Sequence, residues 1–139
     1  TRPWQHVLEP ISGYLSLAIE LYENDNCHGE AYNFGPYFDK DYKVSQVLDE
    51  LKKTFKDLNW SVIPSTSFKE PTLLKLDCSK ASERLDWQSA LSFKETISFT
   101  SSWYLNFFQN QNKIHLYSES QIEKYIEIAK TKKIKWTQT

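Results

Sequence analysis

The sequence predicts an α/β fold, because stretches with helical spacing of apolar residues alternate with short apolar runs typical of strands. The helical patterns cover about residues 10–23, 44–58 and 79–85, and two longer ones begin near Ser92 and Ser118. The strand-like runs lie at 31–34 and 60–63. With 139 residues, 40% of them hydrophobic and 15% aromatic, the chain can fill the core of one modest domain.

The first helix and the first strand have recognisable ends. Pro10 suits the first turn of a helix, where its missing N–H costs nothing, and apolar residues then recur at helical spacing as far as Tyr22. The polar run 24–26 ends this helix. The apolar run 31–34 is closed by Gly35-Pro36, which predicts a buried strand followed by a turn.

The middle of the chain predicts a helix, a strand and a loop in that order. Apolar residues from Val44 to Leu58 are spaced for an amphipathic helix, and residues 60–63 are expected to form a strand after it. Residues 64–71 are polar and bounded by prolines, so we expect a loop. Asp77 then follows at a position where it can cap a short helix over residues 79–85.

Two capping boxes predict the starts of the last two helices. Ser92 with Glu95 precedes an apolar face that runs to Phe107, and Ser118 with Gln121 precedes an apolar stripe. The expected members of that stripe are Ile122, Tyr125, Ile126 and Ala129. Large aromatic residues at helix spacing are expected in the core, namely Trp87, Trp103 and Tyr104. The lysines from 130 to 135 are interpreted as a solvated helix end that complements the helix dipole, in preference to an anion-binding patch.

Composition argues against nucleic acid, membrane and metal as partners. The net charge is -1, from 17 basic and 18 acidic residues, so no global field attracts a polyanion. Apolar runs stay well short of the roughly 20 residues that span a bilayer. Cys27 and Cys78 lie far apart, without C-x-x-C spacing or clustered histidines, so we expect reduced thiols and no metal site. These patterns predict a soluble, cytoplasmic protein.

Six sequence blocks follow one another along the chain. They are R-P-W-Q-H-V-L-E-P at 2–10, Y-N-F-G-P at 32–36, L-L-K-L-D-C-S-K-A at 73–81, L-D-W at 85–87, T-S-S-W-Y at 100–104 and S-E-S-Q-I-E-K-Y at 118–125. In this order they resemble the CDP-glucose 4,6-dehydratases of the extended short-chain dehydrogenase/reductase group, nearly from end to end. The chain departs from that family at 85–89, where the family has L-G-W-x-P, and at 69–71, where it has His-Glu-Ala. The second departure leaves the exact nucleotide sugar open.

The resemblance implies two parts of a larger α/β enzyme. Residues 1–36 would be the last strand and helix of a Rossmann-type NAD-binding domain, and residues 37–139 would be the small mixed α/β domain that binds the nucleotide sugar. The parent enzyme would use NAD to convert CDP-glucose to CDP-4-keto-6-deoxyglucose, for the deoxysugars of surface polysaccharide such as O-antigen. It would commonly form a homo-oligomer.

The chain itself lacks the catalytic machinery that the resemblance implies. It has only three glycines, Gly13, Gly29 and Gly35, at spacings that cannot form a dinucleotide fingerprint, and it has no Tyr-x-x-x-Lys pair. It also contains no methionine. We therefore expect a C-terminal piece that is inactive and binds no NAD by itself, with a missing N-terminal Rossmann half as its partner.

The first block supplies two candidate contacts for the nucleotide sugar. The family places an arginine of this motif against the diphosphate, and the guanidinium fork of Arg2 suits phosphate; the alternative is a surface arginine packed on Trp4. His6 offers a hydrogen-bond donor or acceptor in the same pocket, or else is a buried structural histidine. If the segment is extended, Trp4 and His6 share one face and Gln5 lies on the other.

Two further candidates lie later in the chain, and no residue is a candidate for catalysis or metal binding. Asn33 matches a position at the end of the sheet near nucleotide or cofactor in the family, and could instead stabilise a turn. Glu70 corresponds to the acidic residue of the His-Glu-Ala loop, and could instead be an exposed carboxylate.

Two classes of function stay open at this point. The leading hypothesis is the nucleotide-sugar-binding portion of a CDP-glucose 4,6-dehydratase, a lyase. The alternative is a non-catalytic nucleotide-sugar-binding or assembly module that has lost the Rossmann half.

Overall fold

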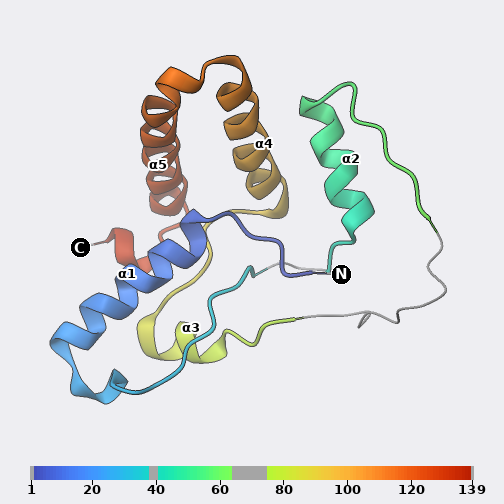
Figure 1. Ribbon diagram of the computed structural model, residues 1–139. Helices are drawn as coiled ribbons and strands as arrows, with labels where there is room; N and C mark the ends of the chain where they lie inside the picture. The colour runs from blue at the N-terminus through green and yellow to red at the C-terminus, as the bar shows by residue number, and fades with distance from the viewer. Residues whose placement is uncertain (1, 38–40, 64–74, 139) are drawn as a thin grey trace.

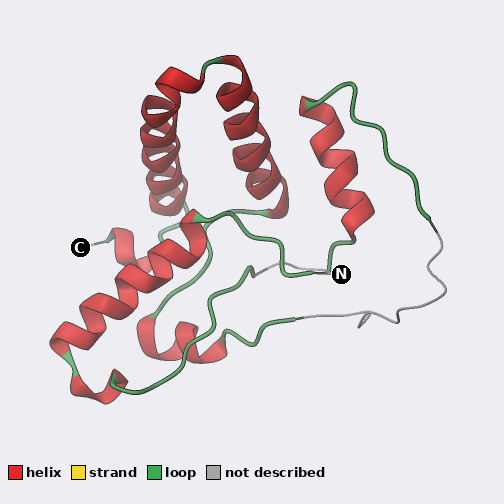
Figure 2. Cartoon of the chain, viewed as in Figure 1, coloured by secondary structure: helices red, strands yellow, loops and turns green. Residues whose placement is uncertain are grey.

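The computed structural model describes residues 2–37, 41–63 and 75–138, and over these ranges the chain is helical (Figures 1 and 2). Its elements are α1 (Leu8–Glu23), η1 (Asp25–Cys27), α2 (Val44–Thr54), α3 (Ser79–Leu85), α4 (Phe93–Gln109), η2 (Gln111–Lys113), α5 (Ile114–Thr131) and η3 (Lys135–Thr137). Helices α4 and α5 form an antiparallel pair, α2 packs against α4, and α1 packs against α3. Among the described residues, no helix is long and apolar enough to cross a membrane.

Neither predicted strand forms within the described ranges, so the expected mixed α/β architecture is wrong there. Residues 31–34 and 60–63 adopt no regular structure. A strand needs a neighbour to accept its backbone hydrogen bonds, and neither segment has one in this part of the chain. The apolar residues of the first run are instead used for packing on helices. Those of the second run are largely exposed, with Val62 at 78% and Ile63 at 85%.

The segment 31–36 packs along α1 through Phe34. Its ring meets Trp87 edge to face, with centroids 5.0 Å apart, and Trp87 is 2% exposed. The same ring lies so close to Gly13 that a Cβ added there would be 2.3 Å from Phe34 Cδ1. Gly13 in α1 is therefore required by a close approach of two segments. The predicted core role of Trp87 is confirmed.

Helix α2 begins at the predicted residue but ends four residues early, at Thr54. Beyond it the backbone N–H of Leu58 donates to Phe55 O, and the Asn59 side chain donates to Asp57 O. Such local hydrogen bonds compete with helical ones, which explains the early end. Within α2, Val47 is buried in a cluster with Phe93 and Ile97 of α4.

Helix α4 starts with the predicted capping box, whereas α5 does not. The Ser92 hydroxyl accepts from the Glu95 N–H, and the Glu95 carboxylate accepts from the Ser92 N–H. Helix α5 begins at Ile114, four residues before the expected Ser118 cap. Ser118 lies inside this helix, where its hydroxyl donates to Ile114 O at 2.9 Å, so the second capping box is wrong.

The burial of α4 and α5 also differs in part from the prediction. Tyr125 and Ala129 are buried as expected, but Gln121 is buried in place of Ile122, which is 44% exposed. Tyr104 is 49% exposed and is not a core residue. The main core, between the start of α1, α4 and α5, comprises Ala90, Leu91, Phe99, Tyr125, Ala129 and Ile134.

The lysines near the C-terminus are not only a solvated helix end. Lys132 Nζ donates to Ala90 O at 2.5 Å and to Glu95 Oε2 at 2.9 Å, and Lys135 pairs with Asp86. Lys132 therefore joins the end of α5 to the residues around the start of α4, and Lys135 joins η3 to the C-cap of α3. The predicted domain boundary between residues 36 and 37 remains a prediction, although buried contacts such as Phe34 with Trp87 join its two sides.

Candidate functional site

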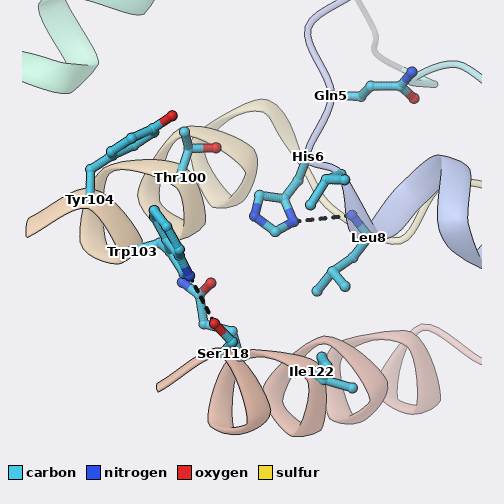
Figure 3. A pocket seen from close by; sticks show the side chains of 10 residues that line it. Gln5, His6, Leu8, Thr100, Trp103, Tyr104, Ser118 and Ile122 are labelled. Carbon is cyan, nitrogen blue, oxygen red and sulfur yellow. Dashed lines mark hydrogen bonds between the residues drawn. The ribbon is translucent and has the colours of Figure 1, made fainter. Parts of the chain in front are cut away.

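A cavity of about 430 Å³ opens between the segment preceding α1 and the facing sides of α4 and α5 (Figure 3). Its lining residues are Gln5, His6, Val7, Leu8, Thr100, Trp103, Tyr104, Ser118, Gln121 and Ile122. We call it the His6 cavity. The first sequence block supplies one wall and the T-S-S-W-Y and S-E-S-Q-I-E-K-Y blocks supply the other. Blocks far apart in sequence thus meet at one place.

His6 presents a neutral imidazole to this cavity. The residue is 8% exposed, its ring contacts Phe99 edge to face at 5.5 Å, and burial lowers its pKa to about 4. Nδ1 accepts a hydrogen bond from the backbone N–H of Leu8 at 3.4 Å. Because Nδ1 is an acceptor in a neutral ring, the proton belongs on Nε2, which leaves that atom as a donor.

The opposite wall is held in place by its own hydrogen bonds. Trp103 Nε1 donates to Ser118 Oγ at 2.9 Å, as Figure 3 shows. Gln121 Nε2 donates to Phe99 O at 2.8 Å and to Ser102 Oγ at 3.2 Å. Polar groups engaged in this way are preorganised, so the wall offers a fixed aromatic and amide surface.

The chemistry of the His6 cavity suits a flat, uncharged group. None of the ten residues lining it carries a Lys, Arg, Asp or Glu side chain. Trp103 and Tyr104 offer ring surfaces for stacking, and His6 and Gln5 offer polar atoms for orientation. A diphosphate would lack a cation among these residues, whereas a nucleobase or a similar ring would be accommodated.

A second cavity, of about 970 Å³, lies where 35–37, 75–79 and 87–89 meet beside α3. It is more polar and includes Lys75, Asp77 and Glu83 in its lining. Burial is the largest influence on the Cys78 thiol in this cavity and raises its pKa. Tyr37 N–H donates to Ser89 Oγ at 2.9 Å across one edge of the cavity.

Of the three predicted contact residues that lie in the described part of the chain, one lines a cavity. His6 lines the His6 cavity, together with Gln5. Asn33 lines neither cavity; its side chain donates to Asp77 O at 3.1 Å and so ties 31–36 to the start of α3. Arg2 is half-buried, accepts the Trp4 N–H through its carbonyl at 3.0 Å, and lines neither cavity. Glu70 lies outside the described residues.

The Glu9 side chain is a buried functional group that the sequence analysis did not single out. Glu9 is 1% exposed and accepts from the N–H groups of Ala90 (3.0 Å) and Leu91 (2.7 Å) and from the Tyr125 hydroxyl (2.9 Å). Burial raises the pKa of its carboxyl, and these hydrogen bonds oppose that rise. A charged residue between two apolar positions in the first block was the available signal, because a glutamate there needs partners to be buried.

The Glu9 network continues to Ser12 and Trp87. The Ser12 hydroxyl accepts from Trp87 Nε1 at 3.0 Å and donates to Glu9 O at 2.7 Å, and it lies 3.1 Å from the Tyr125 hydroxyl, whose single proton it shares with the Glu9 carboxylate. Burial and the nearby Glu9 charge raise the pKa of Tyr125. The network connects α1, α5 and the residues before α4, and therefore holds the wall that carries His6.

The residues described do not fit NAD or a metal ion. Gly13 is covered by Phe34, Gly29 lies in a turn with φ 76°, and Gly35 contacts Leu76 and Cys78, so no two glycines share a phosphate-binding loop. Among the described residues no three His, Cys, Asp or Glu side chains are grouped to hold a metal. A dinucleotide would need other residues.

Comparison with known proteins identifies the relatives of this chain. No protein-family model matches it. The CDP-glucose 4,6-dehydratase of Salmonella typhimurium is 32% identical to it over 126 residues, which are 90% of this chain. The chain spans about a third of the length of that relative, 35%. The resemblance inferred from the six blocks is therefore confirmed, and the chain is a homologue of the C-terminal part of a CDP-glucose 4,6-dehydratase.

Proposed function

We propose that this chain is the nucleotide-sugar-binding C-terminal portion of an NAD-dependent CDP-glucose 4,6-dehydratase. The observation that carries the proposal is the 32% identity to the Salmonella enzyme over 90% of the chain. The parent enzyme would act on CDP-glucose in the cytoplasm, in the synthesis of deoxysugars for surface polysaccharide. It would form a homo-oligomer, and NAD would be held by the Rossmann half, because the residues described here do not fit it.

Two features of the molecule support binding of the base and of the diphosphate by different residues. The His6 cavity offers ring surfaces and neutral polar atoms, which suit the base of a nucleotide. Arg2, four residues before His6, offers the cation that the diphosphate requires and that this cavity lacks. Asn33 and Glu70 remain proposed contacts; Asn33 lies in the segment 31–36, and Glu70 lies outside the described residues.

Calorimetry with CDP-glucose tests this proposal on the chain and on three variants. Arg2→Ala should lose roughly 2–3 kcal/mol of binding free energy, on the order of a hundredfold in affinity, because two charge-assisted hydrogen bonds disappear. Arg2→Lys should recover part of that loss, since it keeps the charge but not the fork. Arg84→Ala, at an exposed arginine of α3, is the matched control and should bind like the wild type.

Two results would contradict the assignment. If no variant and no wild-type chain binds CDP-glucose, the chain is not a nucleotide-sugar-binding portion. If Arg2→Ala keeps its affinity but melts at a lower temperature, Arg2 is a structural residue packed near Trp4.

The coding sequence upstream of Thr1 distinguishes the enzyme hypothesis from the alternative, a non-catalytic module. An in-frame glycine-rich fingerprint followed by Tyr-x-x-x-Lys supports the dehydratase. A start codon immediately upstream supports a module that binds nucleotide sugars without transforming them.

A further inference from the structure

The His6 side chain leaves one hydrogen-bond donor unused at the His6 cavity. The residue is 8% exposed, so its ring is largely removed from bulk water. Nδ1 accepts from the Leu8 N–H at 3.4 Å, which leaves the proton on Nε2. Among the described residues, no group accepts a hydrogen bond from Nε2. Buried polar atoms nearly always have a partner, so we expect a ligand in the cavity to supply an acceptor.

The Gln121 amide leaves one acceptor unused at the same cavity. Gln121 is 7% exposed and lines the cavity from α5. Its Nε2 donates to Phe99 O at 2.8 Å and to Ser102 Oγ at 3.2 Å. These two bonds use both amide hydrogens and fix which end of the amide is the nitrogen. Within the part of the chain that the structure describes, Oε1 accepts from no donor, so it remains an acceptor for a ligand.

The donor and the acceptor are both held against Phe99 of α4. The His6 ring meets the Phe99 ring with centroids 5.5 Å apart, and the Gln121 amide is bonded to Phe99 O. No ionised side chain among the lining residues competes with them. A neutral donor and a neutral acceptor arranged in this way recognise a flat group that carries an acceptor beside a donor.

Trp103 supplies a fixed ring on the wall that faces His6 (Figure 3). Its Nε1–H donates to Ser118 Oγ, which sets the orientation of the indole. Phe107 stacks on Trp103 with centroids 5.3 Å apart and 9° between the ring planes, and Tyr104 meets it edge to face. No second ring of the described residues stacks on Trp103, so a ligand ring placed there would extend the stack.

We propose that His6 and Gln121 select cytosine as the base of the nucleotide sugar, with the base stacked on Trp103. The proposal deepens the proposed function and rests on it. The ring nitrogen N3 of cytosine accepts from His6 Nε2–H, and the exocyclic amine on C4 donates to Gln121 Oε1. Uracil in the same position has a hydrogen on N3 and an oxygen on C4, so a donor would face a donor and an acceptor an acceptor. Adenine presents the same pair as cytosine, and the choice between these two follows from the proposed substrate.

Calorimetric titration with CDP-glucose and UDP-glucose tests this selection. The measured quantity is the ratio of the two affinities, because a variant that only loosens the fold lowers both affinities and leaves their ratio unchanged. The wild-type chain should prefer CDP-glucose by about a hundredfold, which is about tenfold for each reversed contact. His6→Phe removes the donor but keeps a ring against Phe99, and Gln121→Met removes the acceptor at similar size. Each should lower the ratio by about tenfold.

His115→Phe is the matched control for the substitution at His6. His115 is an exposed histidine of α5 that does not line the cavity, so this variant should keep the wild-type ratio.

A measurement on the wild-type chain covers the case in which a variant does not fold. In nitrogen NMR spectra of the chain labelled at histidine, CDP-glucose should shift the Nε2 resonance of His6. The resonances of His28 and His115 should stay in place, because neither residue lines the cavity. Ribose 5-phosphate, which has no base, should leave all these resonances in place.

Several results would overturn the selection by His6 and Gln121. It is wrong if the wild-type chain binds CDP-glucose and UDP-glucose equally, or if His6→Phe and Gln121→Met keep the wild-type ratio. It is also wrong if His115→Phe lowers the ratio as much as His6→Phe, or if CDP-glucose binds without moving the His6 Nε2 resonance. The proposed function fails by a different result, namely that neither nucleotide sugar binds the wild-type chain. Equal binding of both contradicts only the selection of the base.

Discussion

The inner and outer faces of α1 make opposite use of the same helix. The inner face holds Glu9 and Ser12 in hydrogen bonds that reach α5 and the residues before α4. The outer face, which carries Ile11, Leu15, Ile19 and Tyr22, displays large apolar side chains that are 41–92% exposed. The comparison teaches that polarity alone does not tell which side of a helix is buried. Polar side chains whose hydrogen bonds are all satisfied can be buried, while apolar side chains of the same helix stay exposed.

Replacing Glu9 should have the largest effect on the inner face. Glu9→Ala leaves the N–H groups of Ala90 and Leu91 and the Tyr125 hydroxyl without their acceptor in a buried site, and we expect a loss of roughly 3–5 kcal/mol in the free energy of unfolding. Urea denaturation followed by circular dichroism measures it. Glu23→Ala, at an exposed position on the same helix, should change stability by less than about 0.5 kcal/mol. Equal effects of the two variants would remove the distinction between the faces.

Acidification should lower the free energy of unfolding through His6, which lies in the segment just before α1. The pKa of His6 is about 4 in the folded chain and about 6.5 when unfolded, so between these pH values the unfolded chain holds a proton that the folded chain does not. The free energy of unfolding therefore falls as pH drops from 6.5 to 4, by up to about 3 kcal/mol. His6→Gln cannot titrate here, so the difference between its pH profile and that of the wild type isolates this contribution. Parallel profiles would show that His6 is solvated.

Adding a methyl group at Gly13 should lower the free energy of unfolding by less than the loss of the Glu9 carboxylate does. Gly13→Ala puts a methyl group against the buried Phe34 ring, which we expect to cost about 1–3 kcal/mol, partly offset by roughly 1 kcal/mol from the better helix propensity of alanine. Thermal melting shows the net change. Gly13→Ala combined with Phe34→Leu should be less destabilised than the two single changes added together, because the smaller side chain removes the clash. Simple additivity would mean that α1 and 31–36 are not in close contact.

The smallest effect belongs to the outer face. Ile19→Ser removes an apolar side chain that is 59% exposed, so the unfolding free energy of the chain alone should change by about 0.5 kcal/mol or less. Chemical denaturation with the same probe as for Glu9→Ala makes the two faces directly comparable. A loss above about 2 kcal/mol would show that Ile19 is packed within this chain.

The helices were predictable from local signals, and the strands were not. Periodicity and caps placed α3 at its observed bounds and the start of α4 at Ser92, since both depend on neighbouring residues. Ser118 and Gln121 satisfied the same cap pattern but face Trp103 and Phe99 from inside α5. Strands depend on partners far along the chain, and a run such as 60–63 carries no information on whether a partner is present.

The candidate site was predictable only in part, for the same reason. His6 was identified from its block, but the cavity around it required α4 and α5 to bring Trp103, Tyr104 and Gln121 next to it. The apolar stripe of α1 correctly predicted a helix, and it would ordinarily be assigned to a core. The exposure of this stripe could not be predicted from the residues, because an apolar pattern does not tell whether the segment that packs on it lies in the same chain.

The Glu9 network also constrains when its hydrogen bonds can form during folding. Its hydrogen bonds join residues separated by 81 positions (Glu9 to Ala90) and by 116 positions (Glu9 to Tyr125). Closing loops of that length precedes any gain from the contacts. During synthesis, these two hydrogen bonds therefore form only after Ala90 and Tyr125 have been made. Until these partners are present, the carboxylate of Glu9 is expected to stay hydrated, because a buried carboxylate without hydrogen-bond donors is costly.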